Sequence, residues 1–225
     1  MRRSYGSGGA LYVRPLLFGS GARIGLQPAD AYDLVVLVTP VGVYYEGGLK
    51  AVNARVVDEF DRAAPKGVGA VKLAGNYAPD LQPNIQAKNE GYPIGLYLDA
   101  NTKTFVEEFS TSNLFGIDAE NTYVTPESTA ILPSITNDSL MRIAKDTLGL
   151  NVERRPLRFD DLETFKEVAA CGTAVVVTPV KLLHRDPDID FTYDAHPICE
   201  QLYTHMTAIQ RGDEKDTFHW MEDVL

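Results

Sequence analysis

Short strand-like runs follow one another closely along this chain, and they restrict its possible folds more than any other feature. Three stand near the start: LYVRPLLF at 11–18, DLVVLVTP at 33–40 and KAVNARVVD at 50–58. Each is rich in Val, Leu or Tyr and is bounded by Gly, Pro or Asp, which is typical of strands that end in turns. The segment 95–109 then has the form of a hairpin around residues 101–103. The chain is therefore expected to build most of its core from a sheet.

Helices are expected at fewer places. The clearest covers residues 135–150, where apolar residues recur on one face, an Asn/Asp/Ser cluster marks the start and Gly149 marks the end. Further helices are predicted over 78–89, 161–168 and 198–209, and further strands over 113–118, 121–126, 151–159 and 174–180. This order of elements predicts an α+β fold, with one domain over residues 10–225 and a flexible tail over residues 1–9.

Composition fits a folded globular chain and argues against several classes of partner. Hydrophobic residues make up 44% of the 225 residues, enough for a core. The formal net charge of −10 disfavours nucleic acid and anionic membranes, because both repel an acidic protein. No apolar run approaches the roughly 18 residues of a membrane-spanning helix.

The two cysteines, Cys171 and Cys199, form neither a CxxC pair nor a zinc spacing. No metal site is therefore predicted, and so few cysteines favour a reducing compartment. The cytoplasm is the expected location. The mitochondrion is the alternative, since the basic, Gly/Ser-rich start MRRSYGSGG is either a frayed tail or the remnant of a targeting peptide.

The stretch KLAGNYAP at 72–79 places one lysine between a β-like VGAV run and an apolar-glycine run. This setting favours a backbone held beside the core, with the Lys72 amine pointing into a cavity. Burial lowers the pKa of a lysine and makes its amine a nucleophile able to form a Schiff base. A lysine that reaches solvent at a strand end is the alternative, and the stretch taken alone favours it.

Glu107 and Glu108 stand together in TFVEEFSTSN, at the end of a predicted hairpin strand. Side chains alternate along a strand, so one carboxylate is expected to point inward and the other outward. An inward glutamate needs a cationic partner or must take up a proton. A solvated strand end and a plain ion pair with the lysine are the alternatives.

Two segments are candidates for binding an anion. LPSITNDS at 132–139 leads into the clearest helix, whose free N–H groups and dipole favour a phosphate, and Thr136 can add a hydroxyl. CGTAVVVTPV at 171–180 offers a small Gly-Thr-Ala turn whose donors can approach an anion closely. The alternatives are ordinary helix capping by Asn137 or Asp138, and an ordinary strand entry.

Arg14 interrupts an apolar strand and shares a strand face with Tyr12. A guanidinium on an inward face is costly without an anion, which a carboxylate substrate can supply. An arginine that faces water at a strand edge is the alternative. Tyr44, in TPVGVYYEGG, is a similar aromatic candidate, or else a core residue.

The order of these motifs, from YVRP and PVGVYYEGGLK through KLAGNYAP, EEFSTSN and LPSITNDS to CGTAVVVTPV, resembles the branched-chain amino acid aminotransferases. These are enzymes of fold type IV that use pyridoxal 5'-phosphate (PLP). The resemblance runs from about residue 10 to the C-terminus, and the sequences EEFSTSN and AACGTAVVVTP are similar to those of fungal members. It implies a large, C-terminal domain with a mixed, barrel-like β core and flanking helices. It also implies a homodimer, and that the N-terminal small domain of these enzymes is absent from this chain.

The resemblance assigns a cofactor site. Lys72 would bind the PLP aldehyde as a Schiff base and then move a proton between the amino acid's α-carbon and the cofactor. Glu108 would face the pyridine nitrogen and keep it protonated, and Tyr77 would bond the phenolic oxygen. The phosphate would be held by Ile135, Thr136 and Thr173.

The resemblance also implies a substrate pocket and a reaction. The residues at pocket positions are Tyr12, Arg14, Tyr44, Thr111 and Ala174. Donors among them would receive the α-carboxylate, and apolar walls would receive the branched side chain. The reaction would convert L-leucine, isoleucine or valine and 2-oxoglutarate into a branched 2-oxo acid and L-glutamate.

The chain departs from the family pattern at several positions. Ser134 and Asn137 stand where members commonly have glycine and arginine, and FST at 109–111 stands where many have Gly-Gly-Thr or Gly-Thr. Other fold type IV activities are therefore alternatives: a D-amino acid transaminase, an (R)-amine transaminase or an aminodeoxychorismate lyase. A truncated, catalytically impaired PLP-binding domain is another alternative. Arg14 together with Tyr12 favours the branched-chain interpretation.

Overall fold

The computed structural model describes residues 9–42 and 49–222 of the chain. These residues belong to two compact units, which divide between residues 46 and 47. The single domain predicted over residues 10–225 remains a prediction.

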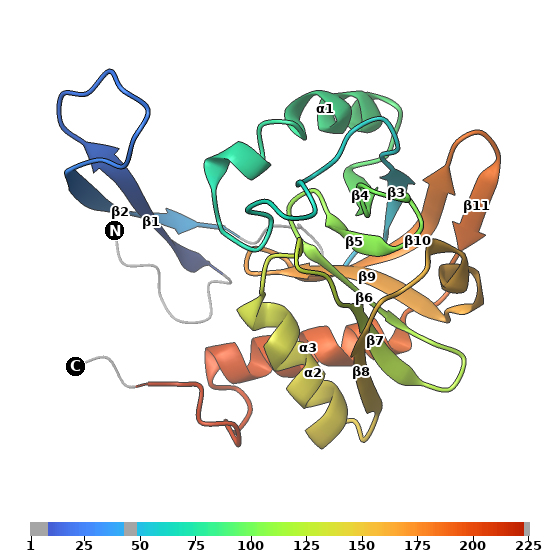
Figure 1. Cartoon of the computed structure of the whole chain (residues 1–225). Coiled ribbons are helices and arrows are strands. Elements are labelled where there is room, and N and C mark those ends of the chain that lie inside the picture. Colours follow the sequence, from blue (N-terminus) through green and yellow to red (C-terminus); the bar gives the residue numbers. More distant parts are fainter. Residues whose placement is uncertain (1–8, 43–48, 223–225) are drawn as a thin grey trace. The chain divides into compact units, whose positions relative to one another are not determined.

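The first unit is an antiparallel hairpin of β1 (Ala10–Ser20) and β2 (Ala31–Val41), which confirms the two strands predicted there (Figure 1). Because side chains alternate along each strand, the register gives the hairpin two unlike faces. One face carries exposed apolar residues: Leu11, Val13, Pro15, Leu17, Leu34, Val36, Val38 and Pro40. The other face carries polar side chains among apolar ones, including Tyr12, Arg14 and Thr39.

The second unit is built on a closed ring of strands (Figure 1). The ring consists of β3 (Val52–Val56), β4 (Ile94–Leu98), β5 (Val106–Phe109), β6 (Asn113–Ile117), β9 (Glu167–Gly172) and β10 (Val176–Arg185). It closes because β9 pairs with both β6 and β10, while β10 also pairs with β3. β3 runs parallel to both of its neighbours, and the other pairs are antiparallel. This is the mixed, barrel-like core that the family resemblance implies.

Further strands extend the sheet from the ring. They are β7 (Thr122–Pro126) beside β6, β8 (Asn151–Arg155) beside β7 and β11 (Ile189–Thr192) beside β10. Short 3-10 helices occur at Ala74–Asn76 and Phe159–Thr164.

Alternation along the ring strands separates two hydrophobic clusters. Leu114 and Val168 belong to the cluster that fills the ring, whereas their neighbours Phe115 and Ala169 belong to a second cluster outside it. The second cluster includes apolar residues of α2 and α3. The ring is therefore packed on its inner side and, along β6 and β9, on its outer side as well.

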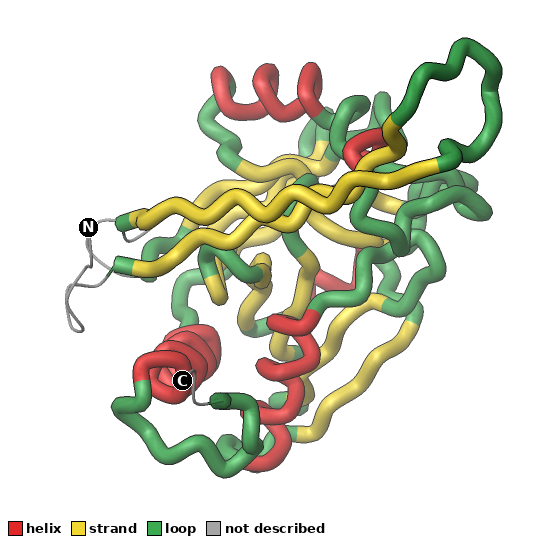
Figure 2. The backbone as a smooth tube through the Cα atoms, turned by 90° about the vertical axis from the view of Figure 1, so that its left-hand side faces the viewer, coloured by secondary structure: helices red, strands yellow, loops and turns green. Residues whose placement is uncertain are grey.

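The helices cover the ring from two sides. α2 (Ile135–Asp146) and α3 (Pro197–Arg211) contact each other and β9, and α1 (Leu81–Asn89) contacts β4. In Figure 1 and Figure 2, α1 lies on the opposite side of the strands from α2 and α3. Among the described residues, no helix has both the length and the apolar character needed to cross a bilayer.

Two segments differ from the sequence-based expectation. The helix predicted over 161–168 is wrong, because a 3-10 helix ends at Thr164 and Glu167 already begins β9. Its run EVAACG is covered on both faces, so it lacks the polar–apolar alternation that marks a half-exposed strand. β11 was not predicted, because its short sequence IDFT is mostly exposed and gives no core signal.

Candidate functional site

Glu108 lies at the end of β5, beside the turn into β6, and is only 4% exposed. Its Oε1 accepts a hydrogen bond from the Leu132 N–H at 3.0 Å, and its Oε2 accepts one from the Asn113 side-chain amide at 3.0 Å. The Arg62 Nη2 forms an ion pair with Oε1 at 2.8 Å. Burial raises the pKa of Glu108 to about 7, and the Arg62 guanidinium opposes part of that rise. The carboxyl can therefore exchange a proton near neutral pH.

Arg62 is a buried cation of this site that was not predicted from the sequence. Its Nη2 also donates to the carbonyl oxygen of Gly69 at 3.2 Å and to that of Ala130. Arg62 stands in DEFDRAAPKG, where acidic residues, proline and glycine indicate a solvated loop. No local signal therefore marks it, because its partners come from distant parts of the chain.

Glu107 is also buried, which corrects the expectation that only one of the two adjacent glutamates points inward. Its Oε1 accepts a hydrogen bond from the Ser128 hydroxyl at 3.0 Å, so the chain beyond β7 covers the second face of β5. Burial raises the pKa of Glu107, while the Ser128 hydrogen bond and Arg62 oppose the rise. Two buried acids thus share Arg62 as a cationic neighbour.

Lys72 and Tyr77 lie together on the loop that leads to α1. The Lys72 Nζ is 5.6 Å from the centre of the Tyr77 ring. The side chain of Asn76, which is buried, closes the preceding turn by donating to the carbonyls of Val68 at 2.8 Å and Val71 at 2.9 Å. The Lys72 charge lowers the pKa of Glu108, so the amine lies within electrostatic range of that carboxylate.

Lys72 itself is exposed, and the expected placement of its amine in a buried cavity is wrong for this structure. Its neighbours Val71 and Leu73 are exposed as well, at 55% and 46%. The VGAV run before Lys72 forms turns rather than a strand, so the backbone there follows the surface.

The start of α2 is capped and braced by side chains. Ser134 Oγ accepts from the Asn137 N–H at 3.1 Å, so Ser134 is the cap rather than Asn137 or Asp138. The buried Asn137 side chain accepts from the Tyr123 hydroxyl at 2.7 Å and donates to Thr125 Oγ1 at 2.9 Å. This hydrogen-bonded chain fixes the first turn of α2 against β7.

The same helix start can receive an anion. Thr136 is 7% exposed and Ile135 is 84% exposed. Within the residues that the structure describes, the N–H groups of these two residues have no acceptor.

The turn after β9 lies at the same edge of the ring of strands as Glu108 and the β5–β6 turn. A Cβ added to Gly172 would be 3.6 Å from the Ser112 Cβ, so this turn stands beside the one that follows Glu108. Thr173 and Ala174 are exposed in the β9–β10 turn, and Thr111 is exposed in the β5–β6 turn. The loops that meet at this edge are 62–77, 110–112, 127–135 and 172–175.

The sequence and the edge geometry both agree with one known family. The family model of amino-transferase class IV matches the chain over residues 3–183. This chain belongs to the class IV aminotransferase family.

Relatives and solved structures of class IV aminotransferases cover nearly the whole chain. A branched-chain-amino-acid aminotransferase of Helicobacter pylori is 42% identical over 98% of the chain, and aminotransferase atnJ of Emericella nidulans is 42% identical over 98%. The chain spans 65% and 66% of the length of these two relatives.

Among solved structures, the branched-chain amino acid aminotransferase of Escherichia coli matches with a TM-score of 0.82 and 28% identity, over 95% of this chain and 70% of that one. The branched-chain aminotransferase of Thermoproteus uzoniensis with norvaline matches with a TM-score of 0.77 and 25% identity, over 93% and 68%. These likenesses agree with the fold type IV core described above.

The residues of the ring edge fit the cofactor that class IV aminotransferases use, which is PLP. Lys72 offers an amine for the aldehyde, and Glu108 offers a buried carboxylate, which favours a protonated ring nitrogen beside it. The N–H groups at the start of α2, beside the hydroxyl of Thr136, suit a phosphate. All three groups belong to the second unit.

The residues predicted to line the substrate pocket are divided between the two units. Thr111 and Ala174 lie at the ring edge, whereas Tyr12 and Arg14 lie on one face of the hairpin. Arg14 donates to the Tyr12 hydroxyl, and its guanidinium carbon is 5.2 Å from the centre of the Tyr12 ring. Tyr44 lies outside the described residues. These pocket assignments remain predictions.

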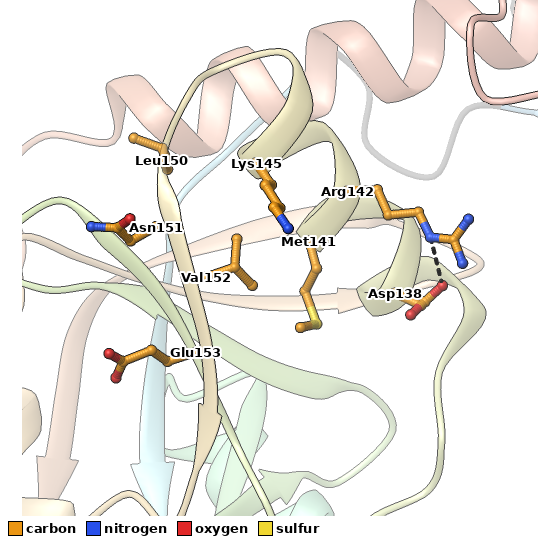
Figure 3. Close-up of a pocket in the computed structure, with 8 residues that line it drawn as sticks. All are labelled: Asp138, Met141, Arg142, Lys145, Leu150, Asn151, Val152 and Glu153. Carbon is orange, nitrogen blue, oxygen red and sulfur yellow. Dashed lines mark ion pairs between the residues drawn. The ribbon is translucent and has the colours of Figure 1, made fainter.

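A groove of about 510 Å³ between α2 and β8 is a separate feature of the surface (Figure 3). Met141 and Val152 line it, and Asp138 and Arg142 form an ion pair at 3.3 Å along its rim. None of the predicted site residues lines it.

Proposed function

We propose that this chain catalyses the PLP-dependent transamination of branched-chain L-amino acids, with 2-oxoglutarate as acceptor and L-glutamate as product. The observation that carries the proposal is the ring edge, where Lys72 lies within electrostatic range of the buried Glu108 beside the start of α2. The names of the Helicobacter pylori relative and the Escherichia coli structure support branched-chain substrates.

Each residue at the edge has a distinct task in this proposal. Bound PLP supplies an electron-withdrawing ring that stabilises negative charge on the substrate's α-carbon. Glu108 would hold a proton at the ring nitrogen, because a carboxylate stabilises the cationic form of a base beside it. Lys72 would hold the aldehyde, and after the substrate's amine displaces it, the freed Lys72 amine would take the proton from the substrate's α-carbon. Tyr77 donates to the phenolic oxygen.

The phosphate and the substrate have their own proposed ligands. The N–H groups of Ile135 and Thr136, the Thr136 hydroxyl and the exposed Thr173 hold the phosphate. The proposed substrate pocket consists of Tyr12, Arg14, Tyr44, Thr111 and Ala174. In it, the Arg14 guanidinium receives the α-carboxylate.

A homodimer in the cytoplasm, with the mitochondrion as the alternative compartment, completes the proposal. The family resemblance supports the dimer, and light scattering of the purified chain measures it directly. A mass twice that of the 24.7 kDa chain is the expected result.

Assays with three amino donors test the reaction. L-leucine with 2-oxoglutarate and added PLP should yield glutamate, whereas D-alanine and a simple chiral amine should yield little. A preference for D-alanine or for the amine would reject the branched-chain assignment in favour of another fold type IV activity.

One observation favours a second candidate, a PLP-binding chain that turns over slowly. Lys72 is exposed, and water at a PLP site weakens electrostatic control over the reacting groups. In that case the chain would bind PLP at Lys72 and produce little glutamate from any of the three donors.

A further inference from the structure

Arg62 lies at the centre of the ring edge without belonging to any of the motifs described above. It is 5% exposed, and Nη2 contacts Glu108 Oε1 at 2.8 Å, the Gly69 carbonyl at 3.2 Å and the Ala130 carbonyl. The three partners come from β5, from the loop that carries Lys72 and from the loop before α2. One guanidinium group therefore joins three segments that would each supply a different part of the cofactor site.

The close approach of two of these loops depends on a glycine. A Cβ placed on Gly69 would lie 2.2 Å from the Ala130 carbonyl oxygen, so no larger residue fits there without a backbone shift. Arg62 donates to the carbonyls on both sides of this contact. The loop that carries Lys72 is thus fastened to the loop that leads into α2.

We propose that Arg62 is a positioning residue for the cofactor site, which favours the ionised form of the Glu108 carboxylate and holds the Lys72 loop against the loop before α2. The identity of the cofactor in this inference rests on the proposed function. Arg62 acts through Glu108 and through the loops, and no contact with substrate is assigned to it.

Several other groups also influence the charge of Glu108. The Leu132 N–H and the charge of Lys72 favour the ionised form, as Arg62 does, whereas burial and the neighbouring Glu107 disfavour it. Asn113 donates to Oε2, and the buried Cys171 thiol lies within electrostatic range. Of these groups, Arg62 is the buried cation in direct contact.

The first test measures the titration of Glu108 in the cofactor-free chain by carbon-13 NMR of the carboxyl groups, with Glu108→Gln to assign the signal. In Arg62→Met the pKa of Glu108 should rise by about one pH unit or more, because a contacting opposite charge lowers a carboxyl pKa by roughly that amount. Arg62→Lys should restore part of the difference, since it keeps the charge. An unchanged pKa in Arg62→Met overturns the inference.

Arg185→Met is the matched control. Arg185 forms two hydrogen bonds with Asp58, each of 2.9 Å, and is half-buried, but it does not contact Glu108. It should leave the pKa of Glu108 unchanged. A rise equal to that in Arg62→Met would overturn the inference, because any lost arginine would then have the same effect.

Loss of folding in Arg62→Met is also informative. If that variant does not fold, the double variant Arg62→Met with Glu108→Gln decides. Recovered folding supports the inference, because the unfolding of Arg62→Met was then caused by an unpaired buried carboxylate. A double variant that stays unfolded overturns it, since Arg62 would be needed for structure alone.

The second test measures binding of PLP by its visible absorbance. At pH 7, affinity should fall by about fivefold or more in Arg62→Met, recover in part in Arg62→Lys and stay unchanged in Arg185→Met, because a rise of the Glu108 pKa from about 7 to about 8 lowers its ionised fraction from about one half to about one tenth. Equal affinity of the wild type and Arg62→Met overturns the inference. If the wild-type chain binds no PLP, the proposed function fails, while the NMR titration still decides the role of Arg62.

Discussion

Glu108 combines near-complete burial with a pKa raised to about 7, so its protonation is linked to the stability of the fold. The ordinary pKa of this carboxyl is 4.5. At pH values between 4.5 and about 7, the folded chain therefore holds the Glu108 proton more tightly than the unfolded chain does. The free energy of unfolding should therefore fall as the pH rises from about 4.5 to about 7. The expected loss is about 3 kcal/mol, at about 1.4 kcal/mol per pKa unit.

Urea unfolding at several pH values measures this loss in the wild type and in Glu108→Gln. The variant should show a flatter dependence, with a residual slope from Glu107, whose pKa is also raised. Glu163→Gln, at an exposed position, is the control and should keep the wild-type slope. An unaltered slope in Glu108→Gln would contradict the assigned pKa.

Two glycines in the Lys72 loop differ in the space around them. An added Cβ at Gly69 meets the Ala130 carbonyl oxygen at 2.2 Å, whereas at Gly75 the nearest atom is a Leu73 methyl at 3.7 Å. Gly69→Ala should therefore destabilise the fold by about 1–3 kcal/mol, as overpacking does, and Gly75→Ala should change it little. Thermal unfolding compares them, and equal stability of the two variants would contradict the close packing of these loops.

At the scale of elements, the hydrogen bonds of Asn137 that hold the first turn of α2 against β7 give a prediction that separates phosphate binding from stability. Tyr123→Phe leaves the Asn137 carbonyl without its 2.7 Å donor, and Tyr193→Phe removes a hydroxyl that donates to the Leu162 carbonyl at 2.9 Å. Both variants should lose stability, by about 1–3 kcal/mol in Tyr123→Phe, which leaves a buried acceptor unpaired, and by about 1 kcal/mol in Tyr193→Phe, where the Leu162 carbonyl still accepts from the Phe165 N–H at 3.2 Å. Only Tyr123→Phe should also weaken binding of inorganic phosphate, measured by calorimetry. Equal phosphate affinity in both variants would contradict the role of this helix start.

Most elements could be predicted because their signals are local. The strands at 11–18 and 33–40 and the helix from residue 135 carry periodicity and end signals within one short window. β9 could not be predicted in this way, because a strand covered on both faces carries no alternation. Arg62 and the burial of Glu107 depend on contacts with the chain beyond β7, which no local pattern shows. The roles of Lys72 and Tyr77 were predicted from the family resemblance. The 5.6 Å from the Lys72 Nζ to the centre of the Tyr77 ring agrees with a shared site.

At the scale of the whole molecule, the two units differ in what holds them together. Both hydrophobic clusters lie within the second unit, and so do Lys72, Glu108 and Thr136. Residues 47–225 alone should therefore fold cooperatively and keep the Glu108 titration of the full chain. Circular dichroism and urea unfolding of this fragment measure the outcome, and a fragment without a cooperative transition would contradict it.

The central claim is that Lys72 binds PLP at the edge of the ring. The most direct measurement is the visible absorbance of the purified chain with added PLP, compared with Lys72→Ala and with Lys66→Ala, an exposed lysine of the same loop. The wild type and Lys66→Ala should show the absorbance of lysine-bound PLP after removal of free cofactor, and Lys72→Ala should not. A colourless wild type, or a Lys72→Ala variant that keeps the same spectrum, would contradict the claim.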